Sequence, residues 1–365
     1  MKYKDNWEET QERFIAWWNR SCVGRPLMKV VAKREKPIGD PEKEIPFLTP
    51  EDMYINVEEN IKRFRNYNLK YSMLAEAFPH FSMNFGPGSL ALYLGSQPVF
   101  AWDTVWFTDN AKDGWSKISD LRFNPDNPIW IRHLEIINKA RELSKDDFLI
   151  DIPDLVEGID ILAAMRGPFQ FCYDLIDIPD IIKKYMDQLD ELYFKFFDPM
   201  YNSVKLENQS CSYTAFDIWG PGKTAKVQCD FCAMMSPDQF REFVQPYLEK
   251  QCNLLDHSLY HLDGPDCIKH IDALMEIKSL DALQWTPGAG NPDGGHELWY
   301  PIYDKVKHAD KSLWISLYDD DLRNCVENAE KLVKRYGSDG LYLLFPTMSE
   351  NDAKELIKKA EQKWK

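Results

Sequence analysis

Hydrophobic residues recur with a helical period at the start of the chain and form short apolar runs further on. Residues 5–20 place four aromatic side chains near one face of a predicted helix, with charges on its other faces. RPLMKVVAKR then predicts a first strand, and the charged, proline-rich residues 35–50 predict an exposed loop. A further helix is expected from Thr49 or Pro50 to about Asn66.

From about residue 72 onward, short apolar runs alternate with longer amphipathic segments. Strands are predicted for FSMNFGPG, DTVWF, FLIDIPDL, PFQFCYDLID, SYTAFDIWG, TAKVQCDF, HSLYHLDG, LDALQWTPG, SLWISL and GLYLLF. Helices are predicted for IIKKYMDQLDELYFKFF, SPDQFREFVQPYLEKQCNLL, HELWYPIYDKVKHAD, DLRNCVENAEKLVKRY and SENDAKELIKKAEQKWK.

The order of these elements predicts the fold class. Strands and helices alternate in the last third, and this order builds a parallel sheet covered by helices. A strand count near eight, without a dinucleotide-binding fingerprint, favours an α/β fold of the closed (β/α)8 TIM barrel type with an N-terminal helical extension. Although 365 residues would also suit two domains, we expect one domain. Residues 1–70 would form its extension, first strand and cover helices, and 71–365 its barrel body, with chemistry at the carboxyl ends of the strands.

Charge and composition exclude several classes of protein. Lys and Arg total 44 against 59 Asp and Glu, a formal charge of −15, and no basic cluster is visible, so no nucleic-acid partner is expected. No stretch approaches the ~18 consecutive apolar residues of a membrane span, and the first residues lack the apolar core of a secretory signal. The eight scattered cysteines are therefore expected to be reduced thiols in a cytoplasmic protein. A homodimer is compatible with the charge and the aromatic content, which do not require one.

The aromatic content, with 12 Trp, 17 Tyr and 20 Phe, exceeds what a core needs and predicts an aromatic-lined pocket. Trp219 closes the run SYTAFDIWG and Trp285 follows in LDALQWTPG, while Trp102 and Trp106 flank Asp103. Tryptophans at successive strand ends predict a face on which a planar or apolar ligand stacks. For each of these tryptophans, the alternative is that the side chain is buried in the hydrophobic core.

The run DHSLYHLDG carries the main candidate for chemistry. His261 and Asp263 are two residues apart at a predicted strand end, so their side chains point in the same direction. Such a pair binds a hard or borderline cation, or forms a hydrogen-bonded acid–base pair. The alternative is a histidine that caps the next helix beside an aspartate in a turn.

The segment from Cys229 to Cys232 has the CxxC spacing of redox and zinc sites, but a second such pair is missing. In an extended strand, Gln228 and Asp230 share one face and Cys229 lies on the other. We therefore expect buried thiols beside a polar Asp230 at a strand end. A metal or redox role for either cysteine is the less favoured alternative.

Three further polar residues extend the candidate site. Gln284 precedes Trp285 at the next strand end, and His296 lies in a glycine-rich loop that is long enough to act as a flexible rim. Glu76 precedes the FGPG turn in an otherwise apolar setting, either as a functional carboxylate or as one of many solvated ones. The run GPGKT at 220–224 lacks the spacing of a phosphate-binding loop and predicts a turn between two strands.

The runs CDFCAMMSPDQFREFVQPYLEK, SLYHLDGP, HIDALMEIKSLDALQWTPG and GLYLLF resemble the uroporphyrinogen decarboxylase superfamily, and above all its branch of cobalamin-dependent, corrinoid-protein methyltransferases. The similarity covers roughly residues 70–365, and the Trp-rich first helix followed by GRPL also fits that branch. The resemblance implies a TIM barrel with a site at its mouth. It also implies a corrinoid on a separate partner protein, because this chain lacks the Asp-x-His-x-x-Gly cobalamin signature.

Members of the superfamily that move methyl groups between a corrinoid and a thiol hold zinc with His-x-Cys and a distant cysteine, and the zinc activates the thiol. This chain keeps His261, has Asp263 in place of the cysteine, and offers no soft ligand in FPTMS. The resemblance therefore implies that a zinc site here would need Glu76 or another carboxylate. Few arginines resemble those that bind a porphyrinogen, so that substrate is not expected.

These observations lead to one principal hypothesis and two rivals. We expect a methyltransferase that moves a methyl group between a small methylated amine, ether or aromatic substrate and a corrinoid protein. His261 and Asp263 would orient or protonate the leaving heteroatom, with Asp230 and Glu76 as acid–base partners. One rival is a metal-independent lyase, decarboxylase or glycosidase-like enzyme with the same acid–base groups. The other is a catalytically inactive barrel that binds a small molecule.

Overall fold

The computed structural model describes residues 1–145 and 147–365. The strands of its main sheet are β1 (Leu27–Lys33), β2 (Tyr71–Ala75), β9 (Thr224–Gln228), β10 (His257–Asp263), β11 (Ala282–Thr286), β12 (Ser312–Ser316), β13 (Leu341–Leu344) and β14 (Met348–Ser349). Strands β9 to β13 pair in sequence order and in parallel, and β1 joins β13. Only β2 runs antiparallel within this sheet, on the other side of β1.

The remaining strands form three short pairs. They are the parallel pair β3 (His80–Phe81) with β6 (Leu149–Ile150), and the antiparallel pairs β4 (Pro98–Phe100) with β5 (Val105–Phe107) and β7 (Cys211–Tyr213) with β8 (Ile218–Gly220). A parallel bridge between Ile152 and Tyr213 links the end of β6 to β7. Across the described residues the hydrogen-bonded ladder does not close on itself, so the fold is α/β with a mostly parallel sheet. The closed barrel remains a prediction.

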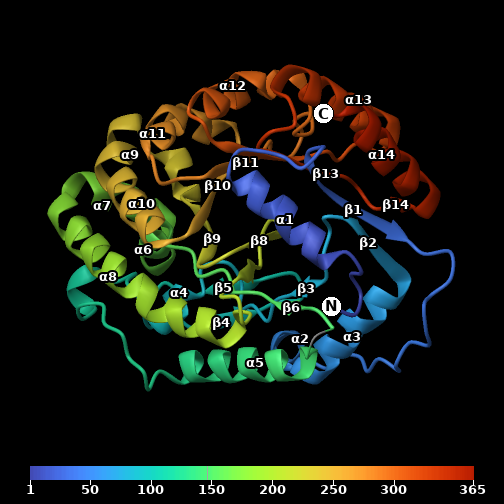
Figure 1. Cartoon of the computed structure of the whole chain (residues 1–365). Helices are drawn as coiled ribbons and strands as arrows, with labels where there is room; N and C mark the ends of the chain where they lie inside the picture. The colour runs from blue at the N-terminus through green and yellow to red at the C-terminus, as the bar shows by residue number, and fades with distance from the viewer. Residues whose placement is uncertain (146) are drawn as a thin grey trace.

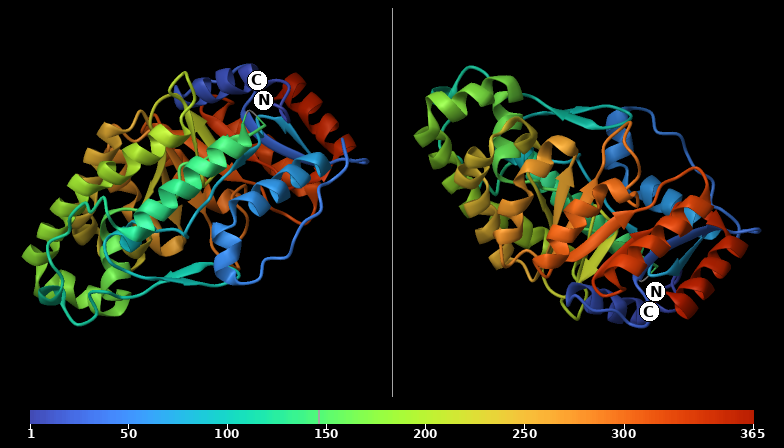
Figure 2. Two further views of the ribbon diagram at one scale, coloured as in Figure 1. Left: turned by 90° about the horizontal axis from the view of Figure 1, so that it is seen from below. Right: turned by 90° about the horizontal axis from the view of Figure 1, so that it is seen from above.

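Helices surround the strands (Figure 1). They are α1 (Trp7–Trp18), α2 (Pro50–Ile55), α3 (Val57–Lys70), α4 (Leu90–Tyr93), α5 (Pro128–Ser144), α6 (Gly158–Arg166), α7 (Pro168–Asp177), α8 (Pro179–Val204), α9 (Pro237–Phe243), α10 (Gln245–Leu254), α11 (Ile271–Glu276), α12 (Tyr300–His308), α13 (Leu322–Tyr336) and α14 (Glu350–Lys363), with short 3₁₀ helices η1 (Trp115–Lys117), η2 (Asp230–Met234), η3 (Pro265–His270) and η4 (Glu297–Trp299). The helices α7 and α14 lie at opposite ends of the molecule in every view (Figures 1 and 2). No helix in the described part of the chain has the length and hydrophobicity that a bilayer crossing requires.

Several predicted elements differ from the structure. SYTAFDIWG, predicted as one strand, is the hairpin of β7 and β8, and SPDQFREFVQPYLEKQCNLL, predicted as one helix, is divided into α9 and α10. The run PFQFCYDLID, predicted as a strand, is the helix α7, because Phe171 and Leu175 are one helical turn apart and both are buried. The helix expected from Pro50 to about Asn66 is interrupted at Asn56 and becomes α2 and α3. The Asn56 side chain accepts a hydrogen bond from Glu59 N at 3.2 Å, so this residue starts the second helix as an N-cap.

The first helix, α1, covers the amino ends of the parallel strands. The Trp18 indole donates a hydrogen bond to Trp219 O at 2.9 Å and stacks on His257, the first residue of β10, with ring centroids 4.9 Å apart. The Trp17 indole donates to Leu313 O, near the start of β12, at 3.2 Å. Because α1 occupies this side, the carboxyl ends of the same strands and the loops after them face the opposite side. The candidate site lies there.

Candidate functional site

Three neighbouring parallel strands carry one row of polar side chains. In the register of the sheet, Gln228 of β9 is opposite His261 of β10, and His261 is opposite Gln284 of β11. Residues opposite each other in a parallel sheet point to the same face. Asp263 follows His261 by two residues at the end of β10, and Asp230 follows Gln228 by two residues at the start of η2. The sheet therefore gathers these groups at one edge.

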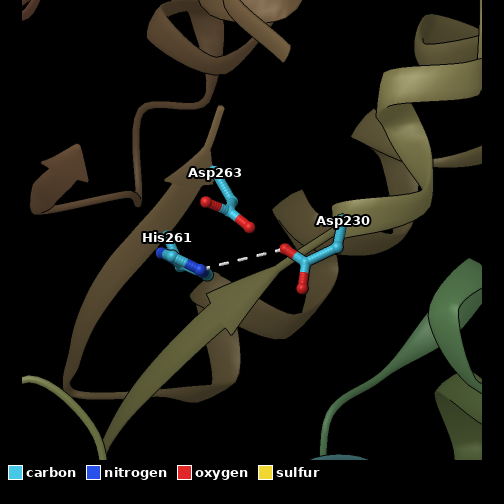
Figure 3. A group of neighbouring side chains, drawn as sticks. All are labelled: Asp230, His261 and Asp263. Carbon is cyan, nitrogen blue, oxygen red and sulfur yellow. Dashed lines mark ion pairs between the residues drawn. The ribbon is translucent and has the colours of Figure 1, made fainter. Parts of the chain in front are cut away.

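Asp230, His261 and Asp263 form what we call the donor cluster (Figure 3). A carboxylate oxygen of each aspartate and a ring nitrogen of the histidine all lie within 4.8 Å of one another. Asp230 Oδ1 is 4.0 Å from His261 Nε2, and Figure 3 shows this carboxylate turned toward the imidazole with that of Asp263 beside them. The structure thus brings together three of the four residues predicted to be catalytic.

The tautomer of His261 is fixed by Gln284. The Gln284 amide nitrogen donates to Thr286 Oγ1 at 2.8 Å, which leaves the amide oxygen to accept the Nδ1 hydrogen of His261. Burial of the imidazole lowers the pKa of His261, so the neutral ring is favoured. In a neutral imidazole that is protonated at Nδ1, Nε2 has a lone pair. This lone pair faces the carboxylate of Asp230, and both atoms are acceptors.

A second glutamine holds Asp230. The Gln228 amide nitrogen donates to Asp230 Oδ2 at 2.9 Å, and its oxygen accepts from the Lys226 ammonium. Lys226 is fully buried and also bonds Asp154 Oδ2 at 2.8 Å, while Asp154 Oδ1 accepts from the Tyr213 hydroxyl at 3.0 Å. Gln228 and Gln284 were predicted to contact substrate. In the structure both are buried and hydrogen-bonded to members of the donor cluster, which they orient.

Asp160, in the first turn of α6, anchors the start of η2. Its two carboxylate oxygens accept from the backbone nitrogens of Asp230 and Phe231, each at 2.9 Å. Burial, followed by repulsion from the Asp160 carboxylate, raises the pKa of Asp230 above its usual range. An excess of negative charge beside His261 favours a bound proton or cation in this place.

Glu76, the fourth predicted catalytic residue, lies outside the donor cluster. Its carboxylate is fully buried and makes a two-pronged ion pair with Arg25, with N–O distances of 2.7 and 2.8 Å. It also accepts from Met28 N at 2.8 Å. Arg13 of α1 lies 3.5 Å from the same carboxylate, and the other partners belong to the start of β1 and the segment before it. Glu76 is the residue directly after β2. Its contacts therefore hold the end of β2 against β1.

The predicted indole wall is not formed around the donor cluster. Trp219 is buried beneath α1, where its ring contacts Trp7 at a centroid distance of 5.5 Å, and Trp285 is buried against Trp299 at 5.0 Å. Trp102 and Trp106 are instead exposed, at the hairpin of β4 and β5. The predicted rim residue His296 caps η4, where its Nδ1 accepts from Leu298 N at 3.2 Å.

Cys229 and Cys232 are buried, and all eight cysteines are free thiols. Burial raises the pKa of the Cys229 thiol to about 12, which disfavours the thiolate that a metal or a redox reaction requires. The GPGKT segment joins β8 to β9 as a turn, as predicted, with Lys223 N bonded to Asp256 Oδ2 at 2.7 Å.

The sequence analysis missed two charged strand residues, Lys226, which is buried, and Lys29, which is half-buried. Lys226 and Lys29 both lie in the middle of apolar strands, and a lysine in a buried strand needs a carboxylate partner. Lys226 pairs with Asp154, and Lys29 pairs with Asp217 at 2.8 Å. A lysine within an apolar strand was the sequence feature from which these ion pairs could have been predicted.

The fold is similar to that of a solved structure described as a methyltransferase from Methanosarcina mazei. The TM-score is 0.60, and the match covers 97% of this chain and 98% of the other at 11% sequence identity. At this identity the likeness establishes the fold. No protein-family profile matches the chain, and no curated protein matches its sequence.

Proposed function

We propose that this protein is a small-molecule methyltransferase of the uroporphyrinogen decarboxylase superfamily, which passes a methyl group between a methylated substrate and a corrinoid protein. One observation carries the proposal. His261 Nε2 and Asp230 Oδ1 face each other as two acceptors 4.0 Å apart, and Asp263 lies within 4.8 Å of both. Facing acceptors repel unless a proton or a cation lies between them.

The donor set fits a divalent cation such as zinc. One imidazole nitrogen and two carboxylates are ligands that zinc accepts without a thiolate, and a metal-bound histidine usually donates its other N–H to a fixed acceptor. Gln284 is such an acceptor. Asp230 takes the place that the sequence analysis gave to Glu76. A cation held there would act as a Lewis acid on the heteroatom that carries the methyl group.

The residues of the chain then have separate tasks. Gln284 keeps Nε2 of His261 free of its proton, and Gln228 turns Asp230 toward the imidazole. Lys226 fixes the orientation of the Gln228 amide, because an ammonium can bind only the amide oxygen. The corrinoid partner remains part of the proposal and is supported by the sequence resemblance.

Methyl transfer to added cob(I)alamin tests the proposal, with methylated amines, ethers and aromatics as donors and absorbance as the readout. His261→Ala should lower the rate at least about a hundredfold, since it removes the central nitrogen of the cluster. The matched control is His308→Ala, on the exposed end of α12. A rate that is unchanged in His261→Ala contradicts the proposal.

The second candidate is the metal-independent acid–base enzyme, because a shared proton would satisfy the facing pair Asp230 and His261 equally well. Metal content separates the two candidates. After incubation with zinc and desalting, the methyltransferase should retain one equivalent, and the Asp230→Asn/Asp263→Asn double variant should retain much less. Equal zinc in both proteins favours the acid–base enzyme.

A further inference from the structure

A cavity of about 340 Å³ opens beside β1, apart from the donor cluster. This volume lies within the roughly 300–1,000 Å³ of small-molecule sites. Its walls are largely aromatic and its base is charged. The rings that line it are Phe64, Tyr67, Phe78, Tyr318 and Phe345, and the charged groups are Lys29, His80 and Asp217. Tyr67, Tyr318 and Thr347 are exposed and mark its opening.

The geometry around His80 requires its ring to be positively charged. Nδ1 is 2.8 Å from Asp151 Oδ2, and Nε2 is 3.0 Å from Asp217 Oδ1. Carboxylate oxygens only accept hydrogen bonds, so both ring nitrogens must donate. The two carboxylates accordingly raise the pKa of His80 to about 10, against the opposing effect of burial. Asp151 lies behind the ring with its side chain only 2% exposed, so it does not face the cavity.

Lys29 has hydrogen-bonding capacity that the protein does not use. Its ammonium donates to Asp217 Oδ2 at 2.8 Å, and within the described residues no second acceptor lies within hydrogen-bond distance. An ammonium carries three hydrogens. Lys29, His80 and Asp217 line the cavity, and Asp151, bonded to His80, completes a group of two positive and two negative charges. Both N–H groups of His80 are used by carboxylates, so within the described part of this group the hydrogens left for a ligand are those of Lys29. A carboxylate can accept them and an ammonium cannot, which favours an anionic ligand over a cationic one.

The cavity adjoins the donor cluster through two consecutive residues. Asp217 forms part of the cavity, and the ring of Phe216 lies against the imidazole of His261 with centroids 4.8 Å apart. A ligand in the cavity would therefore lie next to the turn whose Phe216 ring contacts His261 of the cluster.

We propose that this cavity binds a small planar aromatic carboxylate, whose ring lies among the five aromatic side chains and whose carboxylate accepts hydrogen bonds from Lys29. The inference rests on the proposed function for one step only, the identification of this ligand as the methyl donor or acceptor. In that case methylated aromatic acids are the substrate class, and methylated amines, which are cations, are excluded.

Calorimetric titration with benzoate tests the cavity without any catalytic step. Benzoate should bind more tightly than cyclohexanecarboxylate, which lacks a flat π face, and benzylamine should not bind. Lys29→Met should weaken benzoate at least tenfold, since it removes the charged donor and keeps the length of the side chain. Lys33→Met is the matched control, because Lys33 lies on the same strand and is exposed.

A second variant keeps the test informative if Lys29→Met fails to fold, as judged by circular dichroism. Tyr318 is 57% exposed, so Tyr318→Ala should leave the fold intact and weaken benzoate by removing one wall. Benzoate affinity that is unchanged in both folded variants overturns the inference, and so does tighter binding of benzylamine. Benzoate binding without methyl transfer from any donor supports the cavity and contradicts the proposed function. Methyl transfer from a methylated amine, if benzoate does not inhibit it, supports the proposed function and contradicts the inference about the cavity.

Discussion

Phe216 lies against the imidazole of His261, and the centroids of the two rings are 4.8 Å apart at an interplanar angle of 38°. The residue after it, Asp217, bonds both Lys29 and His80. Phe216 and Asp217 have φ angles of 65° and 48°, a conformation that residues other than glycine seldom adopt. The turn between β7 and β8 thus places one side chain against the donor cluster and the next in the aromatic cavity. Strain at such a turn is typical of functional sites.

Replacement of Gln284 by Leu should impair the donor cluster without removing any of its members. The variant has no acceptor for the Nδ1 hydrogen of His261, so the ring can rotate or change tautomer. Loss of such a supporting contact typically costs about 10- to 100-fold in metal affinity or activity. Zinc retention and the rate of methyl transfer should both fall within this range. Gln170→Leu, at an exposed position of α7, should change neither.

Stability should depend on pH through His80. Its pKa rises from 6.5 to about 10 on folding, because two carboxylates face the ring. The stabilisation is therefore complete below pH 6.5 and is lost as the pH rises from about 6.5 to about 10. The change is on the order of 1.4 kcal/mol for each unit by which the pKa is raised. Besides Asp151 and Asp217, Lys29 belongs to this group of charges.

Urea unfolding of the wild type and of His80→Gln at several pH values measures this contribution. Glutamine keeps a hydrogen-bond donor but carries no charge, so the variant should be less stable at pH 6. The difference between the two proteins should shrink steadily toward pH 10. A difference that is constant across this range would show that the His80 ring is neutral when folded.

The buried ion pair of Glu76 and Arg25 should contribute to stability and not to chemistry. Arg25→Met leaves a fully buried carboxylate without its two-pronged partner, which typically costs about 3–5 kcal/mol in the free energy of unfolding. The double variant Arg25→Met/Glu76→Gln also removes the negative charge of residue 76, whose remaining ion-pair partner is Arg13 at 3.5 Å, and keeps an acceptor for Met28 N. The double variant should recover part of the free energy of unfolding that Arg25→Met loses. A folded double variant should retain zinc like the wild type.

The cysteines should fall into two classes of reactivity. Cys22 and Cys172 are partly exposed, and the other six are buried. Burial and the nearby Asp339 raise the pKa of Cys22 to about 11, so Cys172 should react first with a thiol reagent at neutral pH. The native protein should release the reagent chromophore at no more than two sites, and the unfolded protein at eight. Cys229→Ser should leave zinc content unchanged, and a loss of zinc would assign the metal to the CxxC segment.

Local patterns predict which residues lie at strand ends, and long-range register decides their partners. His261 and Asp263 were found because alternation along β10 gives them one direction, and Asp230 because it follows β9. His80 and Asp217 are 137 residues apart, so only the assembled sheet shows that they are bonded.

The tryptophans were misplaced for a related reason. A tryptophan at a strand end is exposed or buried according to what packs above it. Trp219 is covered by α1, whose Trp18 precedes it by 201 residues. The helix α7 was predicted as a strand because its apolar residues form a short dense run, which suits both elements.

The position of α1 also constrains when this protein can fold. Its two indole donors bind carbonyls of residues 219 and 313, and β1 pairs with β13, so α1 and β1 bind to partners that are synthesised roughly 200 to 300 residues later. Until then their aromatic surface lacks its native cover, and such surfaces promote aggregation of incomplete chains. Assembly of the sheet must therefore await synthesis of β13, and we expect nascent chains of this protein to depend on chaperones until then.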